Sequence, residues 1–173
     1  MVETIIAVLF VLIAFFSVFQ FADNLRTKLL LQHAAARVAR AKTVGFNDYM
    51  LVKTARVATI PVSGKCLSSS EEGGTLGIGE IVERCPSYLA SEHEGFARPL
   101  LDYEYWHDRL HIECSQNGNR FVARVLQERP QFFDLARFLS GEEKSYSDEQ
   151  DEESVMRLHG EASIEAHAPD WMN

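Results

Sequence analysis

The chain has 173 residues, of which 46% are hydrophobic and 24% charged, and its formal net charge at pH 7 is −8. The charge is uneven, because residues 24–60 are basic and residues 62–173 are acidic. An acidic C-terminal part argues against nucleic acid as the partner, since phosphate binding needs the opposite sign.

The first predicted element is an apolar helix over residues 4–22. It contains no charged residue, and only Thr4, Ser17 and Gln20 are polar. At ~1.5 Å per residue, about 19 helical residues approach the ~30 Å hydrocarbon thickness of a bilayer, so we expect a membrane span. The run continues into a further helix without a small-residue cleavage site, which is unlike a cleavable secretory signal.

Glu3 stands directly before this apolar run. A carboxylate that faces hydrocarbon is costly unless it is paired, and the only cation before Arg26 is a terminal amine. We therefore expect Glu3 of one copy to pair with the Met1 amine of a neighbour, which would set the register between the two helices. The alternative is an ordinary acidic residue at a solvated helix N-terminus, where the helix dipole favours it.

Topology has two interpretations. Basic residues after the span, beginning with Arg26 and Lys28, place the C-terminal part in the cytoplasm by the positive-inside rule. If a basic leader is removed before Met1, the original bias points the other way.

Residues 23–43 are predicted to continue the first helix as an amphipathic stem, giving one rod of roughly 40 residues and ~60 Å. The stripe that should pack, on its own head domain or on another subunit, comprises Phe21, Leu25, Leu29, Leu30, Ala34, Val38, Ala41 and Val44. A kink is expected near Gly45. A second helix over residues 49–60 follows, capped by Asn47 or Asp48 and stopped by Pro61.

The fold predicted for the rest is a small antiparallel β-sheet head, which makes the chain α+β. Residues 62–99 are expected to form a loop with at most short strands. Residues 103–126 should form a hairpin around Asn117-Gly118. Its first strand should bury Trp106, Leu110, Ile112 and Cys114, and its second either Phe121, Ala123 and Val125 or the opposite set.

Beyond Pro130, we predict a short helix over residues 131–140 closed by Gly141, then an acidic solvated loop over residues 142–154. Strands over residues 155–159 and 163–167 should complete the sheet. The predicted domains are therefore a helical rod over residues 1–60, divided into residues 1–22 (membrane or filament core) and 23–60 (stem), and a head over residues 61–173.

The three cysteines favour a Cys66–Cys85 disulfide formed outside the cytoplasm, with Cys114 a buried free thiol. The alternative is three reduced thiols in a cytoplasmic head. His107 and His111 have the spacing of helical metal ligands, but in a strand they would lie ~13 Å apart. We therefore expect no metal, no cofactor and no enzymatic activity.

The stretches VETIIAVLF and FADNLRTKLLLQHAAARVARAKTVG resemble type IV pilin-like subunits, most closely the TadE-like pilins and pseudopilins of tight-adherence systems. In these sequences a glutamate opens a hydrophobic helix that runs into an alanine- and arginine-rich half; here Glu3 lies nearer the start than in most pilins. The resemblance implies that Met1 and Glu3 act in assembly. The filament-core residues are then Ile5, Ile6, Leu9, Phe10, Leu12, Ile13, Phe16 and Phe19.

The resemblance also implies a life cycle. A prepilin peptidase would process a precursor in the bacterial inner membrane, and membrane-bound assembly machinery would build an extracellular filament from copies of this chain, with or without other pilins. The alternative is a single-pass membrane protein whose extracytoplasmic head binds a partner without polymerising.

Overall fold

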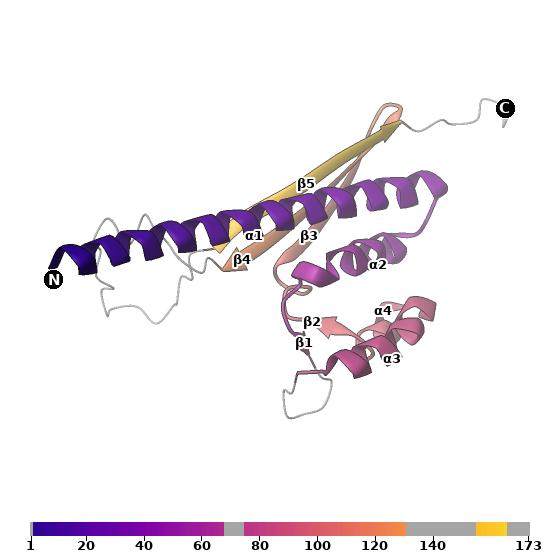
Figure 1. Ribbon diagram of the computed structural model, residues 1–173. Helices are drawn as coiled ribbons and strands as arrows, with labels where there is room; N and C mark the ends of the chain where they lie inside the picture. Colours follow the sequence, from indigo (N-terminus) through magenta and orange to yellow (C-terminus); the bar gives the residue numbers. More distant parts are fainter. Residues whose placement is uncertain (1, 68–74, 131–154, 166–173) are drawn as a thin grey trace, which may run out of the picture.

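The structure, a computed structural model, describes residues 2–67, 75–130 and 155–165. A long N-terminal helix is followed by a small head of short helices and an antiparallel sheet, so the predicted α+β class is confirmed (Figure 1). The predicted helix over residues 131–140, the acidic loop over residues 142–154 and the end of the last predicted strand lie outside the described residues.

Helix α1 (Val2–Val44) is a single helix of 43 residues, which confirms the predicted rod. It ends because Gly45 adopts a left-handed conformation with φ of 87°. The Gly45 amide donates to the carbonyl of Lys42 at 3.0 Å, and the Phe46 amide donates to that of Ala41 at 3.2 Å. This pair of bonds is a Schellman motif, which closes the helix end and reverses the chain.

Helix α2 (Asp48–Thr59) returns alongside the second half of α1 (Figure 1). Its N-cap is Asn47, whose side chain accepts a hydrogen bond from the Met50 amide at 2.8 Å. The helix gives way to a 3-10 turn, η1 (Ile60–Val62), that contains Pro61. The predicted start and stop signals of this helix are confirmed.

Residues 62–99 were expected to form a loop with at most short strands, and this expectation was wrong because the region contains two helices, α3 (Ile78–Ala90) and α4 (Glu94–Ala97). The short strand β1 (Cys66–Leu67) agrees with it and pairs with β2 (Asp102–Tyr103), further along the chain. Helix α3 begins where the Glu80 carboxylate accepts a hydrogen bond from the Gly77 amide at 3.2 Å. Its glycine- and serine-rich surroundings concealed this capping signal in the sequence.

The larger sheet has the strand order β3 (Leu110–Asn117), β4 (Arg120–Pro130), β5 (Val155–Glu165), all antiparallel. The predicted hairpin is confirmed, but its first strand is shorter, because Trp106 precedes β3. The two turn residues are Gly118 and Asn119, and Gly118 has the positive φ (59°) that a type II′ turn needs first. One continuous strand, β5, replaces the two predicted C-terminal strands.

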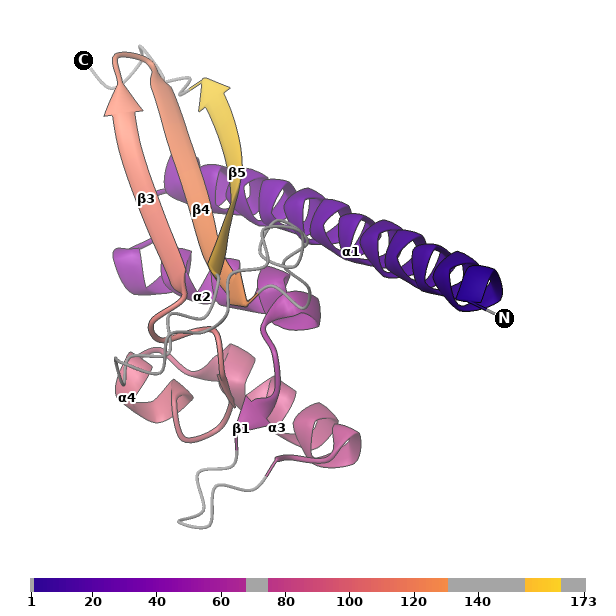
Figure 2. The same ribbon diagram turned by 90° about the vertical axis from the view of Figure 1, so that its left-hand side faces the viewer.

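One face of this sheet packs on α1, as Figures 1 and 2 both show. On β4 the buried residues are Ala123, Val125 and Gln127, with Phe121 half-buried, which is the first of the two predicted sets. The other face is exposed and carries cross-strand ion pairs such as Arg124–Glu161 at 3.0 Å.

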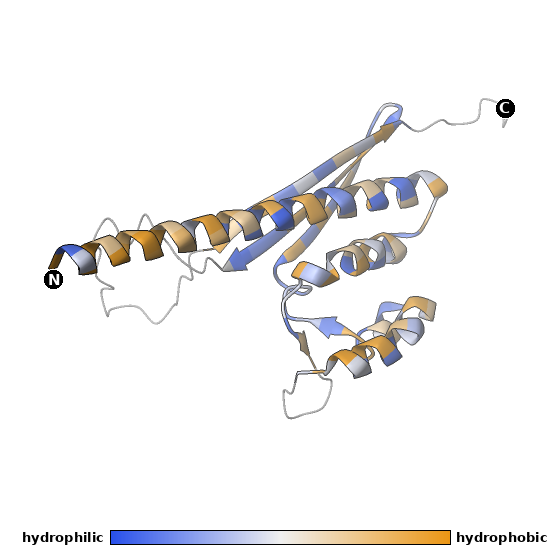
Figure 3. Ribbon diagram, in the orientation of Figure 1, coloured by the Kyte–Doolittle hydropathy of each residue, from blue (hydrophilic) through white to orange (hydrophobic). Residues whose placement is uncertain are grey.

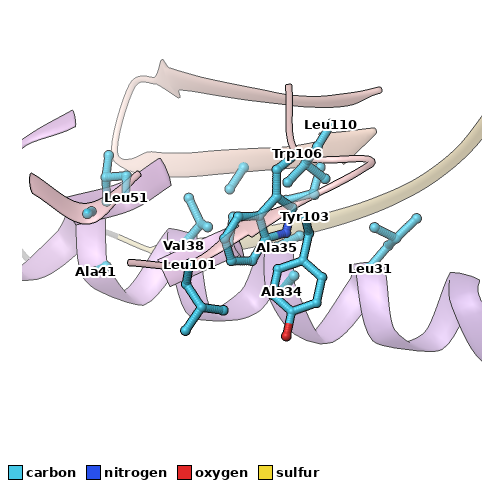
Figure 4. Close-up of a cluster of buried hydrophobic side chains, with 14 of the residues drawn as sticks. Leu31, Ala34, Ala35, Val38, Ala41, Leu51, Leu101, Tyr103, Trp106 and Leu110 are labelled. Atoms are coloured by element: carbon cyan, nitrogen blue, oxygen red, sulfur yellow. The ribbon is translucent and has the colours of Figure 1, made fainter. Parts of the chain in front are cut away.

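The core joins α1, α2, the β3–β4–β5 sheet and the β1–β2 region in one cluster of buried side chains (Figure 4). The rings of Tyr103 and Trp106 lie 4.6 Å apart between centroids. The Trp106 indole N–H donates to the Ser63 hydroxyl at 2.8 Å, so this buried polar group is satisfied.

Part of the stripe predicted on α1 packs on the head, and packing of the rest on another subunit stays a prediction. Phe21, Leu25, Leu29 and Val44 are exposed, whereas Ala34, Val38 and Ala41 are buried as expected. The buried face comprises Thr27, Leu31, Ala34, Ala35, Val38, Ala39 and Ala41. The sheet therefore selected the narrow, alanine-rich side of the helix, because small side chains let the two backbones approach closely.

Candidate assembly interface

The first half of α1 projects beyond the head and packs on no other element of the described chain (Figure 1). None of its apolar window is buried inside the molecule, and its length and composition are sufficient for a membrane span. Figure 3 shows this half as largely hydrophobic, whereas polar residues appear along the second half. The surface has no hydrophilic side that would suit it to water.

All but one of the predicted filament-core residues are exposed. Ile5 and Phe10 retain 69% and 68% of their accessible surface, and Ile13 is half-buried. The other exposed members of the set are Ile6, Leu9, Leu12, Phe16 and Phe19. The described part of the chain leaves this surface uncovered, and burial against lipid or another protein would remove it from water.

The polar residues of this segment differ in their partners. The Ser17 hydroxyl donates to the Ile13 carbonyl at 2.8 Å, which satisfies it inside an apolar environment. Glu3 is exposed in the first turn of α1. The predicted contact of Glu3 with the Met1 amine stays a prediction, because Met1 lies outside the described residues.

Arg129 marks the point where α1 meets the head. From the end of β4, its guanidinium donates to the Asp23 carboxylate at 2.8 Å and to the Thr27 hydroxyl. Asp23 directly follows the predicted 22-residue segment, so the clamp lies at the boundary between the projecting and the packed half. Sequence analysis missed this contact because more than a hundred residues separate its partners.

Gly160 on β5 is a second residue that the sequence analysis missed. A Cβ atom added there would overlap the backbone of Leu31 and Gln32. A glycine inside a strand can mark a close backbone approach, and that signal could have identified this contact. Arg129 and Gly160 thus bring the head against α1 between Asp23 and Gln32.

The cysteines are free thiols in the structure. Cys66 is buried in the core, and the half-buried Cys85 packs against it. The predicted disulfide between them stays a prediction. Burial raises the pKa of the Cys66 thiol above its ordinary value. The expectation of a buried Cys114 was wrong: it is exposed, because β3 is an edge strand that little covers near the hairpin tip.

The two histidines with metal-ligand spacing lie in different settings. His107 precedes β3 and contacts both oxygens of Asp102, at 2.7 and 2.8 Å, whereas His111 lies within β3. In the described parts of the chain no three His, Cys, Asp or Glu side chains are grouped so that they could hold a metal ion.

Comparison of the chain with known protein families, with curated proteins and with solved structures finds no match. The functional argument therefore rests on the surface of α1 and on the residues that leave it uncovered.

Proposed function

We propose that this chain is a structural subunit of a type IV-like pilus or pseudopilus of the tight-adherence type. The observation that carries the proposal is the apolar first half of α1, which projects from the head with its large side chains exposed. Among the residues that the structure describes, the head does not fold back to cover it. If the subunit leaves the membrane, this apolar surface must be buried against other protein, because exposing it to water is unfavourable.

In the proposed filament, neighbouring copies supply that environment. Each projecting helix packs against several others, and Ile5, Leu9 and Phe16 are among the side chains that become buried between subunits. The contacts join different surfaces of successive subunits and do not close, and contacts of that type build fibres. The proposed activity is assembly, with no catalysis and no cofactor.

Glu3 provides specificity in this arrangement. Its exposed position in the first turn of α1 suits a pairing with the terminal amine of the adjacent copy. A helix displaced along the filament axis would leave a carboxylate and an ammonium unpaired in an apolar core, which is costly. Apolar packing thus supplies the driving force, and the charge pair supplies the register.

The proposal places the chain in the bacterial inner membrane before assembly and in an extracellular filament afterwards. Its partners are copies of itself, other pilins, a prepilin peptidase and the assembly machinery of the inner membrane. We expect no nucleic acid partner for the head, because residues 62–173 are acidic and phosphate binding needs positive charge.

Electron microscopy of sheared cell-surface material, combined with mass spectrometry, tests the proposal. We expect thin filaments that contain this chain, and filaments that lack it would exclude the major-subunit role. Glu3→Ala should abolish the filaments while the protein still fractionates with membranes. The matched control is Glu113→Ala, which removes an exposed carboxylate on β3 and should leave filaments intact.

A second candidate is a membrane-anchored protein that does not polymerise. The self-contained packing of the head on α1 favours it, because a head that needs no neighbour also suits a monomer. Its signature would be a chain that stays monomeric in the bilayer and forms no cross-link to another copy through the first half of α1.

A further inference from the structure

The second half of α1 has an exposed side that the head does not use. Leu25 and Leu29 keep 49% and 59% of their accessible surface. Beside them lie Arg26, Arg37 and Arg40, all exposed. At 3.6 residues per turn these side chains lie away from the buried Leu31, and among the described residues the three arginines have no ion-pair partner. We call this set the cationic stem face.

Lipid headgroups cannot account for the whole cationic stem face. Arg26 follows the apolar segment directly, but Arg40 is 14 residues further along the helix, or ~21 Å at ~1.5 Å per residue. Attraction between exposed charges fades beyond ~10 Å at ordinary ionic strength. An acidic surface that is not the membrane is therefore the matching partner for Arg37 and Arg40.

Helix α3 offers such a surface. Ile78, Val82 and Leu89 lie in one row along the helix and keep 83%, 65% and 58% of their accessible surface. Glu83 is exposed beside the row, and the exposed Phe96 of α4 lies next in the chain. We call the row with Glu83 the α3 face.

The C-terminal end of α3 is fastened to α2 and to the core. Lys53 of α2 donates to the carbonyls of Leu89 and Ser91 at 2.7 and 2.6 Å, which fastens the C-terminal end of α3. Tyr88, on the adjoining side of α3, is buried in the core. These contacts place Leu89, at the end of the row, on the side of α3 that faces away from the core.

We propose that the α3 face of one copy docks on the cationic stem face of a second copy. This inference rests on the proposed function, to which it adds a second contact between subunits. Both surfaces combine an apolar row with charges, and the charges are opposite in sign. Residues 63–109 contain nine acidic and four basic side chains, whereas residues 24–44 contain five basic and no acidic ones.

The position of the two surfaces suits a propagating contact. Helices α1 and α3 lie on opposite sides of the molecule, with α2 between them, in both views (Figures 1 and 2). A copy that receives an α3 face on its stem therefore still presents its own α3 face to another copy. Apolar contacts supply the affinity of such an interface, and the flanking charges supply its orientation.

Site-specific photo-cross-linking in membranes and filaments tests the proposal with the full-length chain. Benzoylphenylalanine is introduced at Val82, at Leu9 or at Ser163, and a second, tagged copy is co-expressed. We expect Val82 to cross-link to the tagged copy within residues 25–40, and Leu9 to cross-link within the projecting half of α1. Ser163, on the exposed face of the sheet, is the control and should not reach residues 25–40.

Charge reversal gives a second readout. Arg37→Glu with Arg40→Glu should abolish the Val82 cross-link, and adding Glu83→Arg should restore it. Glu113→Arg, a matched reversal on β3, should not restore it. Circular dichroism checks that the variants keep their helix content, which these exposed positions should not affect.

The outcomes separate this inference from the proposed function. Cross-links from Leu9 without any from Val82 to residues 25–40 would overturn the docking and keep the filament. The docking would also be overturned if the yield of the Val82 cross-link were the same with and without the double arginine reversal. Absence of intermolecular cross-links from both positions would overturn the filament and the docking together.

Discussion

Single residues decide how the head sits on α1. Gly160 lets the backbone of β5 approach the backbone of α1 at Leu31 and Gln32. The two backbones are closer than a residue with a Cβ atom would allow. Arg129 fastens the contact about one turn closer to the N-terminus of α1, through Asp23 and Thr27. One residue acts by lacking a side chain and the other by the reach of its guanidinium, so neither belongs to the apolar pattern.

Gly160→Ala should therefore destabilise the head. The added methyl group must push β5 away from α1, and overpacking of this kind costs about 1–3 kcal/mol in the free energy of unfolding. Chemical denaturation followed by circular dichroism measures the loss. Gly79→Ala on α3 is the control, since nothing lies within 4 Å of the added atom, and it should gain about 0.5–1 kcal/mol. Equal stability of the two variants would contradict the close approach at Gly160.

Alkaline pH should weaken the core through two tyrosines. Burial raises the pKa of Tyr88 and of Tyr103 from 10.0 to about 12. Between these two values the unfolded chain loses the phenolic protons while the folded chain keeps them. The stabilisation is thus complete below pH 10 and declines as the pH rises towards 12.

Urea denaturation at a series of alkaline pH values measures this decline. Tyr88→Phe keeps the ring but has no proton to lose, so its stability should fall less steeply with pH than that of the unmodified chain. Parallel slopes for the two proteins would show that Tyr88 ionises normally in the folded state.

At the scale of the element, α1 serves two environments with one continuous helix. Its second half packs through small side chains on one narrow face, whereas its first half is apolar around its circumference and packs on nothing in the described chain. Helical hydrogen bonding satisfies the backbone in both environments, so the helix needs no break between them. Only side chains change at the boundary near Asp23.

Leu12→Lys should impair membrane insertion, because Leu12 lies near the middle of the apolar half. A lysine at the centre of a membrane helix costs about 2.5–3.5 kcal/mol in insertion assays. Alkaline extraction of membranes measures the fraction that remains inserted. Gln32→Lys, at an exposed position of the second half, should remain fully membrane-bound. Equal extraction of both variants would argue that residues 2–22 do not enter the bilayer.

At the scale of the whole molecule, the head and the projecting half of α1 are energetically separate. The core cluster takes its α1 members from Leu31 onward, and no large hydrophobic side chain of residues 2–19 is buried. The head should therefore fold without the segment that the proposed filament uses. In the proposed filament, that independence would let a subunit exchange lipid for protein around its helix without refolding.

Deletion of residues 2–19 should leave the melting temperature of the head unchanged and yield a monomer by size-exclusion chromatography. Deletion of residues 2–30 also removes Asp23 and Thr27, and it should cost about 1–2 kcal/mol because Arg129 loses both partners at a partly exposed site. Thermal unfolding compares the two truncations. A large loss from the shorter deletion would contradict the separation.

Local signals in the sequence determined much of this fold. An uncharged run determined the apolar half of α1, and Gly45 determined where that helix ends. Asn47 marked the start of α2, and Gly118 marked the hairpin turn. Each acts within a few residues of its own position, through backbone conformation or capping, so the neighbouring sequence is sufficient to find it. The composition of residues 4–22 was likewise sufficient for the candidate interface.

Only the tertiary structure decided which face of α1 is buried and what remains exposed. The helix is apolar in many directions, so its periodicity could not choose between Leu29 and Leu31; the close approach at Gly160 and the clamp at Arg129 made that choice. Cys114 is exposed for a similar reason, since alternation along a strand indicates a face but not what covers it. Contacts between residues distant in the chain depend on geometry that no local pattern contains.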